Sequence, residues 1–117
     1  MKNATKKRQS QLRAYKKVKQ ELEKEFKDNG MWMCFFSGIP FPDYVIYSEV
    51  DWHHIRGRKE SMLTEKEFLV PVLREYHREW HDKPVTELMK EWWFDGFLKR
   101  LKEKDHDMYV KTMYKLQ

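Results

Sequence analysis

The sequence is poor in cysteine, with Cys34 the only one among its 117 residues. A single cysteine permits no disulfide within the chain and no zinc site built from several thiolates. Any metal site must therefore use His, Asp, Glu or Asn side chains. Such sparse use of cysteine suits a reducing compartment, so we expect an intracellular, cytoplasmic protein.

Long apolar runs are also absent. No stretch approaches the roughly 18 apolar residues that a membrane-spanning helix needs, so we expect no membrane partner. Residues 1–19 are basic and polar with no apolar segment behind them, unlike a secretory signal. Internal repeats, low-complexity tracts and long linkers are missing too. We therefore expect one domain over residues 1–117, a usual size for a single core.

Basic residues gather at the start of the chain. The net charge is +5, and residues 1–28 hold ten Lys or Arg against four Asp or Glu, a net of +6 that leaves the other 89 residues at −1. This asymmetry favours an anionic partner such as a phosphate backbone. A solvated helix with basic decoration is the alternative.

The apolar spacing predicts an α+β fold that is mostly helical. Residues 11–28 are expected to form a helix that ends at Asn29-Gly30. Its apolar side chains recur at three- and four-residue steps on one face: Leu12, Tyr15, Val18, Leu22 and Phe26. Two strands are expected over residues 31–36 and 44–55, because both segments are apolar and turn-forming residues separate them.

Helices are expected in the remainder of the chain. Pro71 suits the first position of a helix reaching Asp82, and residues 85–103 and 105–116 predict two more. The aromatic residues near position 93 are interpreted as core, with Trp93 the most exposed of them. A base-stacking surface is the alternative for this aromatic group.

Four of the five histidines form two pairs, His53-His54 and His77-x-x-x-His81. Spacing of four residues on a helix puts both rings of the second pair on one face, as a chelating pair requires. Adjacent residues of a strand point to opposite faces, so His53 and His54 should have different roles. Polar decoration of a surface helix is the alternative for the second pair.

These residues carry a resemblance to HNH endonucleases. Residues 51–58 (DWHHIRGR), 69–72 (LVPV) and 74–81 (REYHREWH) are most similar to the small HNH proteins of bacteriophages and prophages. The resemblance implies a ββα-metal finger over residues 31–83, namely a short β-hairpin plus a metal-binding helix. An N-terminal basic helix (1–30) and C-terminal helices (84–117) would flank it.

The resemblance also implies roles for individual residues. His54 matches the general base that activates water, while His53, His77 and His81 match ligands of one divalent metal ion. Arg58 joins His54 in the implied catalytic set, and Arg56 and Arg58 would face phosphate; a surface salt bridge is their alternative. A neutral imidazole can accept a proton near pH 7. Three imidazoles suit Zn, Ni, Co or Mn, although the family often uses Mg or Mn.

The chain departs from the family pattern at two places. Phe68 stands where the motif has its middle Asn. Many members also carry a zinc knuckle of two Cys-x-x-Cys pairs, and three of its four ligands are replaced here. Cys34 keeps one position, while Ser37, Leu73 and Tyr76 occupy the others. We interpret Cys34 as a small buried hydrophobe.

The remaining candidates concern charge. Asp51 lies two residues before His53 and is either a metal ligand, a partner that fixes an imidazole tautomer, or an ordinary surface carboxylate. The basic residues of the first helix are expected to grip a nucleic-acid backbone without reading its sequence: Lys6, Lys7, Arg8, Arg13, Lys16 and Lys17.

The sequence thus predicts a metal-dependent endonuclease that hydrolyses DNA. Two alternatives stay open. One is a catalytically degenerate HNH fold that only binds nucleic acid or a protein, and the other is a helical accessory protein whose histidines are incidental.

Overall fold

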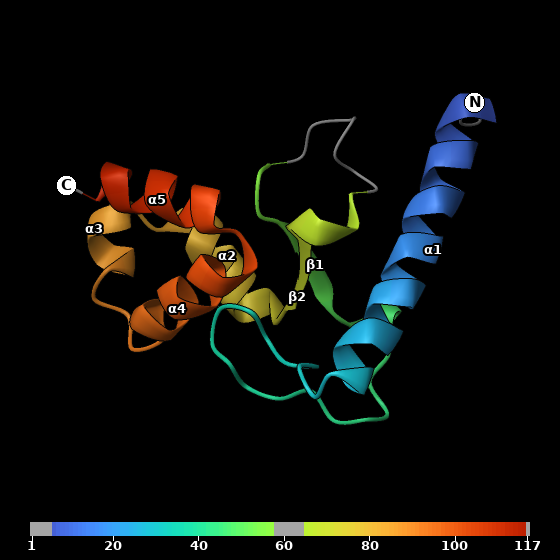
Figure 1. Cartoon of the computed structure of the whole chain (residues 1–117), viewed down its shortest axis with the longest axis horizontal. Coiled ribbons are helices and arrows are strands. Elements are labelled where there is room, and N and C mark those ends of the chain that lie inside the picture. Colours follow the sequence, from blue (N-terminus) through green and yellow to red (C-terminus); the bar gives the residue numbers. More distant parts are fainter. Residues whose placement is uncertain (1–5, 58–64, 117) are drawn as a thin grey trace.

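The computed structural model describes residues 6–57 and 65–116, and it has an α+β architecture that is mostly helical, as expected (Figure 1). Helices form most of the described chain, and two strands form one small sheet. In chain order the elements are α1 (Lys6–Asp28), the 3-10 turn η1 (Tyr47–Glu49), β1 (Asp51–His54), the 3-10 turn η3 (Lys66–Phe68), β2 (Leu69–Val72), α2 (Arg74–Asp82), α3 (Val85–Leu88), α4 (Phe94–Lys104) and α5 (His106–Lys115).

Helix α1 follows the predicted apolar stripe from Tyr15 onward. Leu22 is buried and Phe26 packs against the core, whereas Leu12 is 51% exposed. The helix also begins five residues before the expected start. It ends where predicted, because Gly30 adopts a positive φ of 67° and Met31 N donates to Phe26 O at 2.7 Å.

The expected strand over residues 31–36 is wrong. This segment folds into turns with a single bridge between Met33 and Pro40. Gly38 takes a φ of 76° and donates its N–H to Cys34 O at 2.7 Å, so the chain reverses before a ladder can form. The apolar residues are nevertheless core, since Cys34 and Phe36 are fully buried.

The sheet contains a strand that the sequence did not predict. β1 and β2 pair antiparallel, with Trp52 opposite Pro71 and His53 opposite Val70. Pro71 therefore lies in a strand and does not start a helix, which begins instead at Arg74. A proline is tolerated at this position because only one edge of β2 pairs with another strand, β1. On the other edge, Pro71 O accepts the N–H of Phe35 at 2.9 Å.

The expected helix over residues 85–103 is broken into α3 and α4. Trp93 is 1% exposed and donates its indole N–H to Glu79 Oε2 at 3.0 Å, whereas Trp92 is 67% exposed. The expectation that Trp93 would be the exposed member is therefore wrong. The break between the helices rotates Trp93 inward, where it meets Phe36 and Phe97.

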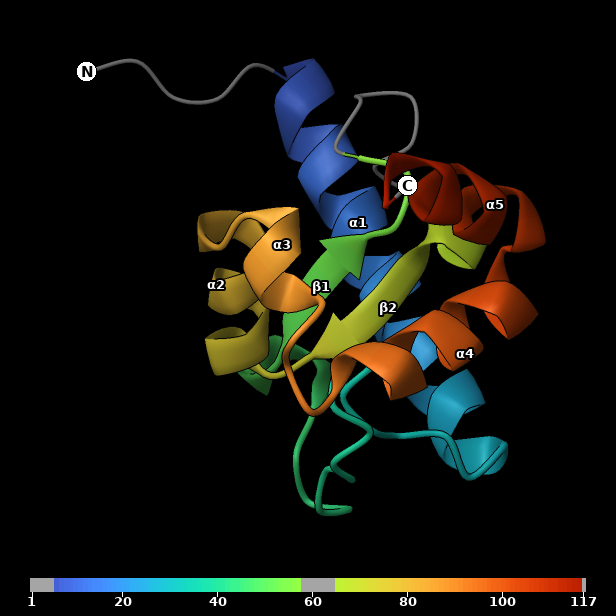
Figure 2. The same cartoon turned by 90° about the vertical axis from the view of Figure 1, so that its left-hand side faces the viewer.

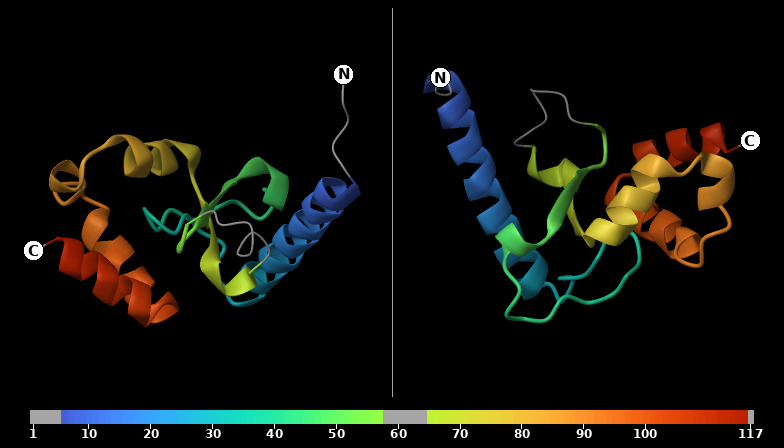
Figure 3. Two further views of the ribbon diagram at one scale, coloured as in Figure 1. Left: turned by 90° about the horizontal axis from the view of Figure 1, so that it is seen from above. Right: turned by 180° about the vertical axis from the view of Figure 1, so that it is seen from behind.

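The small sheet lies between two helical regions. Helix α1 stands at one end and the group α2–α5 at the other, along a longest dimension of 45 Å (Figures 1 and 3). Figure 2 shows β1 and β2 side by side at the centre. The sheet therefore places the histidines of β1 between the basic helix and the C-terminal helices.

Candidate metal and nucleic-acid site

Strand β1 presents its two histidines in different surroundings, as the strand geometry predicted. His53 packs toward α2, with its ring centroid 5.0 Å from that of Phe36 and 5.9 Å from that of Trp80. His54 packs toward α1, with its ring centroid 5.7 Å from that of Tyr15. Both are buried, at 7% and 5% exposed. The two side chains are therefore set up for separate roles.

Helix α2 brings His77 and His81 together on one face. Their spacing of four residues sets the ring centroids 4.7 Å apart, and the two Nε2 atoms lie 3.1 Å from each other. His53 completes the group from β1, with its ring centroid 5.4 Å from that of His77 and 6.1 Å from that of His81. One nitrogen atom from each of the three residues lies within 4.8 Å of the others.

The donor set fits a divalent metal ion. Two nitrogen atoms bound at about 2.0 to 2.1 Å in a tetrahedral site lie roughly 3.3 Å apart. The 3.1 Å between Nε2 of His77 and Nε2 of His81 matches that separation, and a ring nitrogen of His53 lies within 4.8 Å of both residues' ligand atoms. Three imidazoles leave further coordination positions open, as in catalytic sites and unlike closed structural ones.

Burial keeps His53 in the form that binds metal. Desolvation, followed by the nearby His77, His81 and His54, lowers the pKa of His53 to about 3. Its imidazole is therefore neutral throughout the physiological range, and a metal ion does not have to displace a proton from it.

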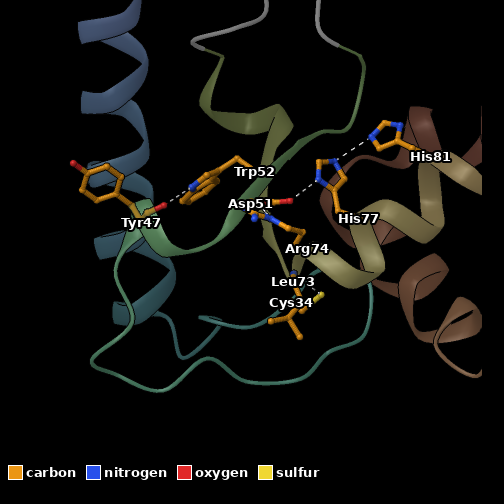
Figure 4. A network of polar contacts seen from close by, with 8 residues as sticks. All are labelled: Cys34, Tyr47, Asp51, Trp52, Leu73, Arg74, His77 and His81. Atoms are coloured by element: carbon orange, nitrogen blue, oxygen red, sulfur yellow. Dashed lines mark hydrogen bonds and ion pairs between the residues drawn. The ribbon is translucent and has the colours of Figure 1, made fainter.

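Asp51 contacts His77, which favours the alternative that it orients an imidazole. Its Oδ2 lies 3.3 Å from His77 Nδ1, and its Oδ1 lies 3.4 Å from Arg74 Nε (Figure 4). A carboxylate only accepts, so Nδ1 of His77 carries the proton. Nε2, the atom that faces His81, is then left with its lone pair. Asp51 thus fixes the tautomer of a candidate ligand.

All four predicted histidines line one cavity. It has a volume of about 390 Å³, and Trp52, Trp80 and Met108 complete much of its wall. His54 reaches it from β1 near the Arg56-Gly57 turn, where Gly57 has a φ of 92° and donates its N–H to His54 O at 3.0 Å. A water molecule has ample room in this space. The candidate base and the candidate ligands therefore line the same cavity, which is large enough to hold water.

Arg56 makes an intramolecular ion pair, the alternative that the sequence left open for it, with a partner that the sequence did not reveal. Its Nε and Nη2 donate to Asp105 at 2.7 and 2.8 Å, and this guanidinium holds the pKa of Asp105 below its usual range. Asp105 also caps α5 by accepting from Met108 N at 3.2 Å. Two of the three donor atoms of Arg56 are thus used within the protein, so its expected phosphate contact stays a prediction. Arg58 lies outside the described residues.

Phe68, which stands where HNH motifs have an Asn, contacts both Ile55 and Arg56. Its carbonyl accepts the N–H of Ile55 at 2.8 Å, and its ring lies 4.4 Å from the guanidinium carbon of Arg56. The two ends of the connection between β1 and β2 are therefore joined by a backbone hydrogen bond and a cation–π contact.

Three of the four positions that the resemblance aligned with a zinc knuckle lie together. Cys34 Sγ accepts the N–H of Leu73 at 3.2 Å and of Ser37 at 3.4 Å. The interpretation of Cys34 as a small buried residue is confirmed, because it is fully buried.

The predicted basic residues lie along the first half of α1. Their side chains are exposed at Lys6, Arg8, Arg13, Lys16 and Lys17, while the Lys7 side chain is outside the described part. Lys19, closer to the sheet, lies 4.3 Å above the Tyr15 ring. Since Tyr15 also contacts His54, this basic surface begins beside the histidine cavity.

Sequence reasoning missed two charged residues of this region. Arg74 is three residues before His77, a spacing that could have placed it on the ligand face of α2. Asp105 is separated from Arg56 by 49 positions, and no local pattern signals that pairing.

Comparisons of the chain with protein-family models, with curated proteins and with solved structures found no match. Across the described ranges, no helix has the length and apolarity to cross a membrane.

Proposed function

We propose that this protein is a metal-dependent endonuclease of the HNH type, which hydrolyses phosphodiester bonds in DNA. The order strand β1, strand β2, helix α2 matches the order of a ββα-metal finger. In this proposal His53, His77 and His81 hold one divalent ion, and His54 is the general base.

One observation carries the proposal. Three imidazoles from two elements, β1 and α2, converge within 4.8 Å, and a fourth lines the same cavity. A structural metal site would be closed by four protein ligands and would have no use for a neighbouring base. Open coordination positions beside a base are what hydrolysis of a phosphodiester needs.

The residues divide the chemistry among them. When bound, the ion would supply Lewis-acid stabilisation at the scissile phosphate and the leaving 3′ oxygen. His54 accepts a proton from the attacking water, which a neutral imidazole does well near pH 7. Asp51 keeps the lone pair of His77 Nε2 available to bind the metal ion. The neutral His53 needs no deprotonation before it binds the ion.

The exposed basic residues of α1 supply the grip on DNA. Between Lys6 and Gln20 there are seven Lys or Arg and no Asp or Glu. Such a surface neutralises phosphates and releases counterions, which gives affinity without sequence preference. The first half of α1 is therefore assigned to binding and the cavity to cleavage.

A plasmid-nicking assay tests this proposal. The wild-type protein is incubated with supercoiled DNA and Mg, Mn, Ni, Co or Zn, beside H54A and the control H106A. His106 is exposed on α5 and belongs to neither pair. Nicking that needs metal, is lost in H54A and is kept in H106A supports the proposal. Wild-type protein that is inert with all five metals contradicts it.

A degenerate HNH fold that only binds nucleic acid is the second candidate. The observations that favour it are Phe68 in the place of the motif Asn and the engagement of Arg56 by Asp105. It predicts tight, salt-sensitive DNA binding without turnover, and binding that survives loss of the metal ligands.

A further inference from the structure

We infer that Arg74 binds a substrate phosphate beside the metal site and that Asp51 positions it there. This inference rests on the proposed nuclease function and deepens it, since it names a further substrate-binding residue. The resemblance assigns no role to Arg74, and the basic stretch of α1 does not include it.

Arg74 lies on the same face of α2 as the candidate ligands. Residues three and seven positions apart on a helix follow one another along one side, which places Arg74, His77 and His81 in a row. Figure 4 shows Asp51 between Arg74 and His77, with one carboxylate oxygen toward each. The guanidinium is therefore linked to the metal ligand through a single carboxylate.

The contact with Asp51 leaves most of the guanidinium available. The Arg74 side chain is 71% exposed, and within residues 6–57 and 65–116 its Nε contact with Asp51 Oδ1 is its only polar partner. An arginine has five N–H donors, so four remain on Nη1 and Nη2. A guanidinium fork binds phosphate through two such donors at once.

Stability alone gives little reason for Arg74 to be there. An exposed ion pair of this kind contributes little to folding stability. Arg74 is also the first residue of α2, and a cation there faces the positive end of the helix dipole. An anionic ligand at this point would offset that unfavourable charge.

The geometry indicates which phosphate Arg74 contacts. Asp51 holds Nδ1 of His77, whereas the ion position is on the Nε2 side toward His81. Arg74 thus lies across the imidazole from the ion. It suits a phosphate next to the scissile one, where it would fix the register of the strand without taking part in bond cleavage.

The matched control is Arg78. It has the same charge on the same helix and is also exposed, but the structure gives it no contact with Asp51. The test uses R74Q, R78Q and D51N in the full chain. Binding of a fluorescent DNA duplex is measured by anisotropy against salt concentration, and binding of Mn²⁺ by calorimetry.

We expect R74Q to lower the slope of log affinity against log salt by about 0.9, the value for one lost phosphate contact. Mn²⁺ affinity should stay within about twofold. R78Q should change the slope by less than half as much. D51N should weaken Mn²⁺ binding roughly 10- to 100-fold and lower the slope too, because it frees Arg74.

The outcomes separate the two claims. Wild-type protein that binds neither Mn²⁺ nor DNA overturns the proposed function and this inference with it. Wild-type protein that binds both, while R74Q keeps the wild-type slope, overturns the inference alone. Equal slope losses in R74Q and R78Q also overturn it, since the effect would then be general charge. A D51N slope equal to wild type contradicts the positioning role of Asp51.

Discussion

The histidine cavity and the first half of α1 both present nitrogen-bearing side chains, but they do so in opposite ways. The cavity gathers the buried imidazoles of β1 with the half-buried His77 and the exposed His81 of α2, and its histidines contact aromatic core residues. The helix displays exposed Lys and Arg on a single continuous element. Chemistry requires convergence of a few groups at fixed distances, whereas backbone binding requires only charge density on an accessible surface.

The two halves of α1 also differ from each other in their contacts with the rest of the protein. Its second half is tied to the rest of the protein, since Glu23 accepts the N–H of Tyr47 at 2.6 Å and Glu21 pairs with Lys66 at 2.7 Å. Its first half holds the exposed basic residues. The helix therefore anchors with its acidic half and would bind with its basic half.

The largest expected effect separates cleavage from binding. H54A should lower the rate of DNA nicking by about 10² to 10⁴-fold, because a positioned general base contributes that much. Its metal affinity and DNA affinity should stay near wild type, since His54 is not among the three convergent ligands. Nicking kinetics and calorimetry on the same preparation check this. A loss of metal binding in H54A would contradict the division of roles.

Neutralising the basic half of α1 should weaken DNA binding and leave the metal site intact. Replacing Arg8, Arg13, Lys16 and Lys17 by Gln should reduce the salt slope of DNA binding by about 3 to 4 and lower affinity by up to about 10³-fold. Metal affinity should not change. The control replaces four exposed lysines elsewhere: Lys90, Lys99, Lys111 and Lys115. Equal losses in both variants would show that overall charge, and not α1, governs binding.

We expect His53, in the cavity, to make the stability of the protein depend on pH. The folded pKa of His53, about 3, lies below its unfolded value of about 6.5. The unfolded chain therefore binds more protons below pH 6.5, and stability is lost as pH falls from about 6.5 toward 3. The loss due to His53 at pH 4 is on the order of 3 kcal/mol.

Urea unfolding of the metal-free protein at pH 7 and pH 4 measures this effect, with H53F as the control. Phenylalanine keeps a ring among Phe36 and Trp80 but cannot titrate. The drop in unfolding free energy between the two pH values should be smaller in H53F. An identical drop in both proteins would mean that His53 is not buried in its neutral form.

The smallest expected effect concerns the support of the cavity. D105A removes the ion pair with Arg56 and the cap of α5, and it should lower the free energy of unfolding by about 2 to 3 kcal/mol. D107A, on the exposed neighbour in the same helical turn, should change it by about 0.5 kcal/mol or less. Thermal or urea unfolding distinguishes them, and similar effects would mean that the Arg56–Asp105 pair carries little energy.

The sequence predicted what depends on short spacing. The His77–His81 pair, the end of α1 at Gly30 and the opposite directions of His53 and His54 all follow from local periodicity. The resemblance added the link between the two pairs, and the convergence of His53 with His77 and His81 agrees with it. The identity of the bound ion and the activity stay predictions.

The rest depended on tertiary context. The segment around Cys34 is apolar enough for a strand, yet the chain reverses direction at Gly38. Its apolar side chains are buried although the segment forms no strand ladder. The sequence predicted that Pro71 begins a helix, but Pro71 pairs with Trp52 and belongs to β2. The partner of Arg56 lies 49 residues away. Such contacts are set by packing of distant elements, which a local pattern does not contain.

Calorimetric titration of the chain with Ni²⁺ or Zn²⁺ shows whether His53, His77 and His81 hold one ion. We expect one ion per chain for the wild type and for H106A, with binding severely weakened in H53A, H77A and H81A. Wild-type protein without a binding event, or unchanged affinity in all three ligand variants, would contradict it.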